Sequence, residues 1–233
     1  MEKLCYVVWK PAGATGAPVR DTFPREAAPA LRACGATKLQ LLVADEHAEA
    51  VQKARLTRLD EPIAGLVTLW LDCVDAHPRI EAVLRAHTAR IAGYLVTESV
   101  VLPNTTHVAT PGARTPGITM LALLEKPERL AFDDWISIWH GKHSPLALEI
   151  QCTYLYVRNV VLRALTPDAP PWRGLVEEGF PAEAVTDPMR WYDAGGDPQK
   201  LRERIGRMVA SVREFLDIER VESHPLAEYR IPD

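Results

Sequence analysis

The sequence predicts an α+β protein built from two similar ferredoxin-like halves. In each half the hydrophobic pattern gives the order strand, helix, strand, strand, helix, strand. A stretch rich in Pro, Gly and Thr at residues 103–117 has no helical period and separates the halves. Each sheet would keep one face against its own helices, so the two remaining faces would stack into an internal pseudo-dimer. We therefore expect domains at residues 1–102 and 118–233, joined by this linker.

The first half is expected to contain four strands and two helices. Strand-like runs place strands at residues 4–9, 38–44 and 92–101, and the near-alternating Leu66, Thr68, Trp70 and Asp72 place another at 62–72. Helical spacing places the helices at residues 23–34 and 77–91, where Pro24 and Pro78 suit a first helical turn.

The second half repeats this order with longer elements. Strands are expected at residues 118–125, 153–165 and 218–229, a short strand or extended segment at 172–180, and a short helix or loop at 181–192. Residues 197–215 have the apolar stripe of an amphipathic helix. A helix over residues 133–151 should break at Ser144-Pro145, because Ser is a good N-cap and Pro suits the first helical position.

The composition excludes several classes of protein. The 233 residues are 47% hydrophobic and 25% charged, which is enough apolar material for a sizeable core. A net charge of -4 without a basic cluster argues against nucleic-acid partners. No apolar run is long enough to span a membrane, and the N-terminus enters a strand rather than a secretory leader. The four cysteines match no metal or redox motif, so we expect buried free thiols and a cytoplasmic protein.

Two histidines and two tryptophans in the helix over residues 133–151 are the best candidates for function. Trp135, Trp139 and His143 are spaced i, i+4, i+8 and share one helix face, with His140 three residues before His143. At the expected break, His143 could reach into a cavity as a general acid or base. The alternative is that the aromatic residues are only core. No third ligand lies nearby, so we expect no metal site.

Two strands of the second half supply further candidates. Alternation puts Tyr154, Tyr156 and Arg158 on one face of the strand at residues 153–165 and Asn159 on the other. Arg158 would either serve a pocket or pair inside the fold with Glu177 or Glu178. These two carboxyls are adjacent in the strand at residues 172–180, so only one should face a pocket, where burial would raise its pKa.

These motifs together resemble the EthD family of the dimeric α+β barrel superfamily. The resemblance covers roughly residues 117–231 and rests on ordered motifs: Trp139-His140-x-x-His143-x-Pro145-Leu146-Ala147, Tyr156-Val157-Arg158-Asn159, Glu177-Glu178-Gly179-Phe180, Gly195-Gly196-Asp197-Pro198, Met208 and Phe215-Leu216-Asp217. It implies an intrachain dimeric α+β barrel. The first half matches in element order only. Leu31 and Arg32 stand about where the histidine motif would be, so that half resembles a degenerate copy. The family residues carried over are Trp139, His140, His143, Arg158, Asn159 and Glu177.

The sequence favours a cofactor-free lyase or isomerase with dehydratase-type acid–base chemistry. Its substrate would be small, mostly apolar, and aromatic or carbonyl-bearing. His143 would move the proton, His140 would support it, and Arg158 or Asn159 would stabilise an enolate. Trp139, Tyr154, Tyr156 and Phe180 would bind the substrate. The alternatives are a cofactor-free oxygenase for a phenolic or polyketide-like substrate, a non-catalytic binding protein, and a haem protein using His140 or His143. The chain would act as a monomer or a homodimer.

Overall fold

A single closed β-barrel forms the centre of the molecule. The computed structural model describes residues 1–10, 17–61 and 63–232. Eight strands form the barrel in the order β1-β3-β2-β8-β5-β7-β6-β4, and every neighbouring pair is antiparallel. The strands are β1 (Glu2–Trp9), β2 (Thr37–Val43), β3 (Ile63–Leu71), β4 (Arg90–Leu102), β5 (Ile118–Glu125), β6 (Leu155–Ala164), β7 (Trp172–Phe180) and β8 (Glu222–Arg230). All eight expected strands are present. Pro62, expected to open the third strand, and Asp233, the last residue of the expected second half, lie outside the described residues.

The predicted division into two ferredoxin-like halves with stacked sheets is wrong. β4 pairs with β6 and β2 pairs with β8, so the first four strands and the last four join at both edges into one continuous sheet. Closure gives hydrogen-bond partners to backbone groups that open sheet edges would leave unpaired. The sequence pattern predicted the strands, but it contained no signal that strands of the first half pair with strands of the second half.

The segment at residues 103–117 contains no helix or strand and runs beside β8. Arg114 forms an isolated bridge with Tyr229, and the Thr115 N–H donates to the Glu228 carbonyl at 2.8 Å. The segment is therefore docked on the barrel. The domain limits at residues 102 and 118 stay a prediction.

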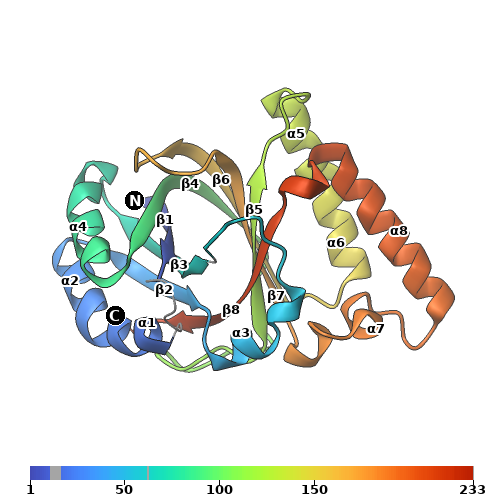
Figure 1. The fold of residues 1–233 in the computed structure, drawn as a ribbon, viewed down its shortest axis with the longest axis horizontal. Coiled ribbons are helices and arrows are strands. Elements are labelled where there is room, and N and C mark those ends of the chain that lie inside the picture. Colours follow the sequence, from blue (N-terminus) through green and yellow to red (C-terminus); the bar gives the residue numbers. More distant parts are fainter. Residues whose placement is uncertain (11–16, 62, 233) are drawn as a thin grey trace.

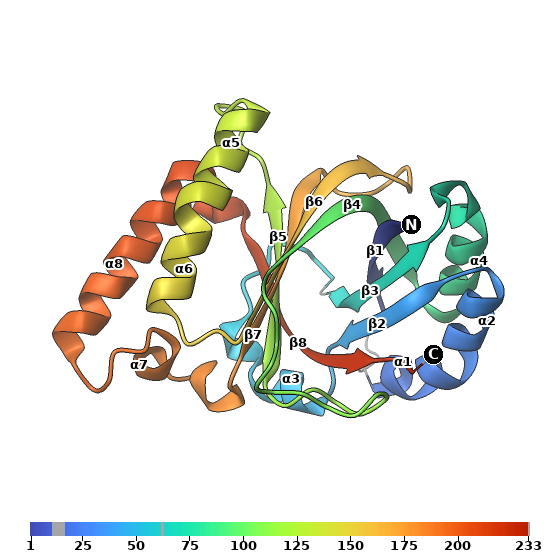
Figure 2. The same ribbon diagram turned by 180° about the vertical axis from the view of Figure 1, so that it is seen from behind.

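Helices cover two opposite sides of the barrel (Figures 1 and 2). On one side lie α1 (Ala17–Thr22), α2 (Ala28–Ala33) and α4 (His77–His87). On the other lie α5 (Phe132–Ile138), α6 (Ser144–Ile150), α7 (Pro188–Trp191) and α8 (Pro198–Phe215). The short α3 (Glu46–Ala50) lies at one end of the barrel near β8. Further single turns are the π-helical η1 (Phe23–Ala27) and η4 (Trp139–His143) and the 3₁₀ turns η2 (Gln52–Ala54), η3 (Val74–Ala76), η5 (Ala182–Ala184) and η6 (Ile218–Arg220).

Three apolar clusters correspond to these layers. One packs α2 and α4 against the first four strands, and another packs α5, α6 and α8 against the last four. The third fills the barrel, where Trp9 stacks on Trp172 with ring centroids 6.4 Å apart and Tyr94 lies beside them. These large rings close one end of the barrel interior.

The expected helix break at Ser144-Pro145 is wrong. The chain passes from α5 through η4 into α6 without interruption, and Ser144 has helical angles of φ -60° and ψ -46°. The Ser144 N–H donates to the Trp139 carbonyl, an i→i−5 bond. This π-helical turn accommodates the missing N–H of Pro145.

The first half of the chain also contains a π-helical turn just before a proline. The π-helical turn Phe23–Ala27 precedes Ala28-Pro29, as Trp139–His143 precedes Ser144-Pro145. The counterpart of the histidine motif is therefore Phe23–Ala27, and the predicted counterpart at Leu31 and Arg32 is wrong. In this alignment Ala27 occupies the position of His143.

All four cysteines are free, as predicted, but they are not all buried. Cys5 is buried and Cys73 is exposed, because Cys73 follows the end of β3. Within the described ranges, no helix has the length and apolar character needed to cross a membrane.

Candidate active site

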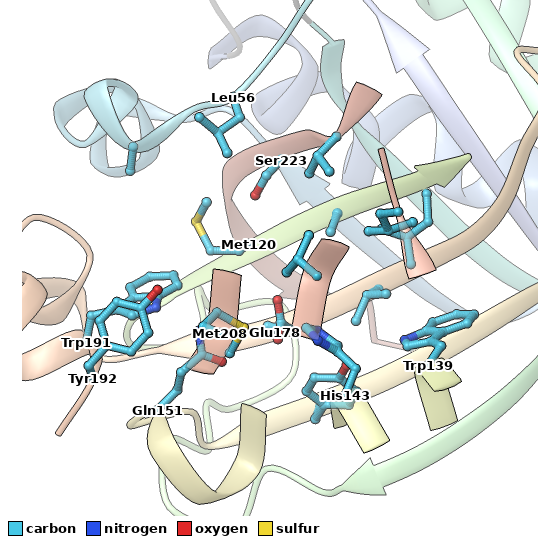
Figure 3. Close-up of a pocket in the computed structure, with 18 of the residues that line it drawn as sticks. Leu56, Met120, Trp139, His143, Gln151, Glu178, Trp191, Tyr192, Met208 and Ser223 are labelled. Carbon is cyan, nitrogen blue, oxygen red and sulfur yellow. The ribbon is translucent and has the colours of Figure 1, made fainter. Parts of the chain in front are cut away.

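A cavity of about 370 Å³ lies between the outer face of the last four strands and the helices that cover them (Figure 3). Its walls are mostly apolar and come from β5 to β8, η4, α7, α8 and the segment after α3. The lining residues are Ala54, Leu56, Met120, Ala122, Leu124, Trp139, His143, Gln151, Tyr156, Val176, Glu178, Val185, Pro188, Trp191, Tyr192, Met208, Val212, Phe215, Leu216, Val221 and Ser223. No Lys or Arg is among them. The volume and character suit a small, largely apolar and uncharged ligand.

Glu178 is the acidic group of this cavity. It lies on β7 opposite Met120 of β5 and Tyr156 of β6, and all three side chains face the cavity. No described residue donates a hydrogen bond to its carboxylate or pairs with its charge. Burial raises the pKa of Glu178 to about 7. A carboxyl in this environment can take or give a proton at neutral pH, which is the property required of a general base or acid.

His143 faces the same space from the helix layer. Its Nδ1 shares a hydrogen bond of 3.0 Å with the Ser211 hydroxyl, and its ring packs against Phe215 at 4.6 Å. Burial lowers the pKa of His143 to about 4, so the imidazole is neutral at physiological pH. Both side chains are labelled at the cavity in Figure 3; Glu178 comes from β7 of the sheet and His143 from η4 in the helix layer. The site therefore combines a neutral imidazole with a carboxyl that titrates near neutrality.

Aromatic side chains and an amide complete the cavity wall. Trp139 is fully buried, and Trp191 and Tyr192 lie at the opposite end in Figure 3. Burial and the charge of Glu178 both raise the pKa of Tyr192, so its phenol stays protonated. The buried Oε1 of Gln151 has no hydrogen-bond partner among the described residues and is free to accept one from a ligand.

Three predicted site residues border the cavity, and two lie behind its wall. His143, Trp139 and Tyr156 line it. Arg158 does not: its guanidinium donates to the Ser144 hydroxyl at 3.3 Å, and that hydroxyl bonds the Tyr156 phenol at 3.3 Å.

His140 and Arg158 are close enough to interact electrostatically. Burial and the charge of Arg158 lower the pKa of His140 to about 4. Its buried Nε2 has no hydrogen-bond partner among the described residues. Neither His140 nor Arg158 lines the cavity. Each could influence a ligand there only through the residues that separate it from the cavity.

The other predicted residues lie elsewhere. Glu177 and Asn159 point into the barrel, where the Asn159 amide donates to Glu177 at 3.1 Å. Tyr154 stacks on His107 at 3.9 Å and donates its hydroxyl to the Pro116 carbonyl. Phe180 stacks on the cavity residue Trp191 at 3.7 Å without lining the cavity itself. The structure thus separates these four from His143.

The sequence names Glu177 and Glu178 as a pair of which one should face a pocket, and the resemblance selects Glu177, whereas Glu178 is the one at the cavity. Alternation in β7 puts Glu178 on the same face as Val176 and the opposite face from Glu177. The cavity residues Leu56, Gln151 and Ser223 had no such signal, because they come from irregular segments or from the start of β8.

The site residues are a poor fit for haem. Haem carries two carboxylates, and no cationic side chain lines the cavity to pair with them, while Glu178 would repel them. His140 does not reach this space, and His143 uses Nδ1 for Ser211. Within the described part of the chain, no three His, Cys, Asp or Glu side chains are grouped as metal ligands.

No family model matches the chain. No curated protein matches it either.

Solved structures show similarity of fold. An anthrone oxidase-like protein is 10% identical, with a TM-score of 0.58 over 100% of this chain and 93% of that chain. A provisionally named monooxygenase of Fusobacterium nucleatum subsp. nucleatum is 8% identical, with a TM-score of 0.52 over 100% of this chain and 93% of that chain. Both neighbours have folds of the dimeric α+β barrel type. At these identities the similarity shows the fold alone.

Proposed function

We propose that this protein is a cofactor-free oxygenase for an uncharged, phenolic or anthrone-like aromatic substrate. The observation that supports this most is the unpaired Glu178 carboxyl, with a pKa of about 7, in an apolar cavity that a neutral His143 also lines. The names of the two structural neighbours point in the same direction. Membership of the EthD family is part of the proposal, supported by the position of Trp139 and His143 at the cavity.

The chemistry begins with proton abstraction. Glu178 takes a proton from an acidic C–H or O–H of the substrate, and the aromatic walls exclude water around the resulting anion. The Gln151 amide and the Tyr192 hydroxyl are placed to hold polar groups of the substrate. The absence of lining cations favours a substrate whose negative charge is delocalised over aromatic rings rather than localised on a carboxylate.

Dioxygen is the oxidant in this scheme. The anion adds dioxygen to form a carbon–oxygen bond, and the peroxide is protonated by Glu178. Loss of water then leaves a carbonyl, so an anthrone methylene becomes the quinone carbonyl. One oxygen atom enters the product and the other leaves as water, together with the two methylene hydrogens. The electron pairs come from the substrate, so the scheme needs no further reductant.

Oxygen uptake with anthrone as the probe tests the proposal. We expect one dioxygen consumed per anthrone oxidised. In anaerobic heavy water, we expect exchange of the methylene hydrogens without net reaction. Turnover that continues without dioxygen would instead favour the lyase or isomerase chemistry that the sequence suggested. Saturable binding with neither exchange nor oxidation would favour a binding protein.

A further inference from the structure

A second cavity lies inside the barrel, on the opposite side of β7 from the candidate active site. Its volume is about 400 Å³. The inward side chains at the closed end are large and apolar, as seen for Trp9 and Trp172. Towards the open end the same strands carry polar inward residues instead: Lys3, Gln40, Thr68, Glu98 and Glu177. Eight-stranded barrels are wide enough to hold one small ligand when side chains do not fill them.

The inner wall of this cavity has more carboxylate than ammonium. Lys3 is 3% exposed and pairs with both Glu98 and Glu177, the latter at 3.6 Å. Burial alone would lower the pKa of Lys3, but the charge of Glu177 and then that of Glu98 raise it above its usual value. One ammonium therefore serves two carboxylates. Buried charge of this kind is costly unless further donors satisfy it.

Glu228 adds a third carboxyl with an acceptor to spare. It is 2% exposed, and its Oε1 accepts from Arg230 at 3.1 Å and from Gln40 at 3.4 Å. Its Oε2 accepts no hydrogen bond of standard geometry from the described residues, although the Thr115 side chain interacts with the carboxyl. Gln40 also donates to Glu177 at 3.0 Å, so its amide protons are already committed. The deep part of the cavity is therefore short of cationic donors.

The rim of the cavity has the opposite charge. The Lys38 ammonium lies 5.1 Å from the centre of the Trp70 ring and has no carboxylate partner in the described part of the chain. Lys38 has a φ of 49°, a left-handed conformation unusual for lysine, at an irregularity in the β2–β3 register. Backbone distortions of this kind concentrate at functional sites. Leu39, Val100 and Val157 add apolar surface between the rim and the inner wall.

We propose that this barrel cavity binds a small zwitterion of the amino-acid type with an aliphatic side chain. Its ammonium group lies against Glu228 and Glu177, and its carboxylate lies against Lys38. The hydrocarbon part contacts Leu39 and Val157. This site is independent of the oxygenase proposal, because none of its residues lines the outer cavity.

Three matched probes test the charge arrangement by isothermal titration calorimetry. L-norleucine carries both groups, pentylamine lacks only the carboxylate, and hexanoic acid lacks only the ammonium. We expect saturable binding of norleucine, binding of pentylamine weaker by roughly tenfold, equivalent to about 1.4 kcal/mol, and no saturable binding of hexanoic acid in this cavity. Equal affinity for all three probes, or no binding of norleucine, would overturn the proposal.

Substitutions of Lys38 and Glu228 test whether the probe binds in the barrel cavity. Lys38→Met should weaken norleucine to the level of pentylamine and leave pentylamine unchanged, whereas Lys53→Met, an exposed lysine outside this cavity, should change neither. Glu228→Gln should weaken both amines. Norleucine binding that is lost in Glu178→Gln but retained in Lys38→Met and Glu228→Gln would assign the ligand to the outer cavity and contradict the barrel site.

Discussion

Glu177 and Glu178 are neighbours on one strand, and their surroundings differ in every respect that matters for chemistry. Glu177 points into the barrel and is satisfied by Lys3, Gln40 and Asn159. Glu178 points outward into an apolar cavity and has no partner among the described residues. The alternation of a β-strand thus separates, by a single residue, a carboxylate with three polar partners from one that has none among the described residues. The comparison teaches that neighbouring residues of one strand can have opposite surroundings, and the proposed function depends on this contrast.

Exchanging each carboxyl for an amide is the sharpest test of this contrast. Glu178→Gln should lower kcat/KM for anthrone oxidation by about 10²–10⁴-fold, the usual scale of general acid–base catalysis. Its free energy of unfolding at neutral pH should stay the same or rise, because an unpaired charge that faces an apolar cavity is removed. Oxygen uptake and urea denaturation measure the two quantities.

Glu177→Gln should affect stability more than turnover. Removing one partner of Lys3 should lower the free energy of unfolding by about 1–3 kcal/mol, less than for an isolated buried pair because Glu98 remains. Any loss of turnover should be far smaller than for Glu178→Gln. If Glu177→Gln abolishes turnover in a folded protein, the assignment of the two roles is wrong.

The pH dependence of stability provides a second test of the unpaired carboxyl. The folded pKa of Glu178 is about 7 against an ordinary value of 4.5. Between these values the unfolded chain has lost the proton and the folded chain retains it, so the contribution of Glu178 to stability falls as pH rises and is lost by about pH 7. Between about pH 4.5 and pH 7, the free energy of unfolding of the wild type should therefore fall by at most about 3 kcal/mol relative to that of Glu178→Gln.

The contribution of His143 to stability changes with pH in the opposite direction, so it must be measured separately from that of Glu178. Its folded pKa of about 4 lies below the ordinary 6.5, so its contribution to stability rises with pH between those values. Comparing Glu178→Gln and His143→Gln with the wild type over a pH series resolves the two. The pH profile of kcat/KM should show an acid limb near 7 from Glu178. A flat difference between wild type and Glu178→Gln would contradict the raised pKa.

The two histidines of the π-helical turn should also differ, by a smaller factor. His143→Gln should lower kcat/KM by about 10–10²-fold, because the imidazole borders the cavity while Glu178 remains as the base. His140→Gln should cost less, since His140 lies behind the wall with Arg158. Steady-state oxygen uptake with both variants checks the order. A larger loss for His140→Gln would reverse it.

Sequence patterns were sufficient to predict the positions of the strands, but not which strands pair with each other. Strand-like apolar runs located all eight strands, and several of these runs are nearly continuous because both faces of the strand are buried, one in the barrel and one against helices. Nothing in the alternation specifies that β4 pairs with β6, so the single barrel could not be predicted from it. Trp139 and His143 line the cavity, and their role there stays a prediction; the expected helix break beside them is instead a π-helical turn. Alternation shows that Glu177 and Glu178 face opposite sides of the strand, but it does not show which side faces the cavity, so it does not choose between them.

The smallest expected effect concerns the part of the cavity that comes from the first half of the chain. Leu56 is 58% exposed and borders the cavity, and its backbone pairs with Ser223 through hydrogen bonds of 2.9 and 2.8 Å. The segment is further held where the Arg58 N–H donates to Glu222 at 2.7 Å. Leu56→Ala should widen the cavity without unfolding the protein, since an exposed leucine contributes little to stability.

We expect Leu56→Ala to raise KM for anthrone by roughly threefold to tenfold, with a smaller effect on kcat, because the substrate loses apolar contact rather than a catalytic group. Leu162→Ala is the matched control: Leu162 is 56% exposed on β6 and lines neither the outer nor the barrel cavity. Equal KM values for the two variants would show that the segment around Leu56 covers the cavity without touching the substrate. A selective rise for Leu56→Ala would show that the first half, which has no histidine in its own π-helical turn, still helps to bind the substrate in the cavity of the second.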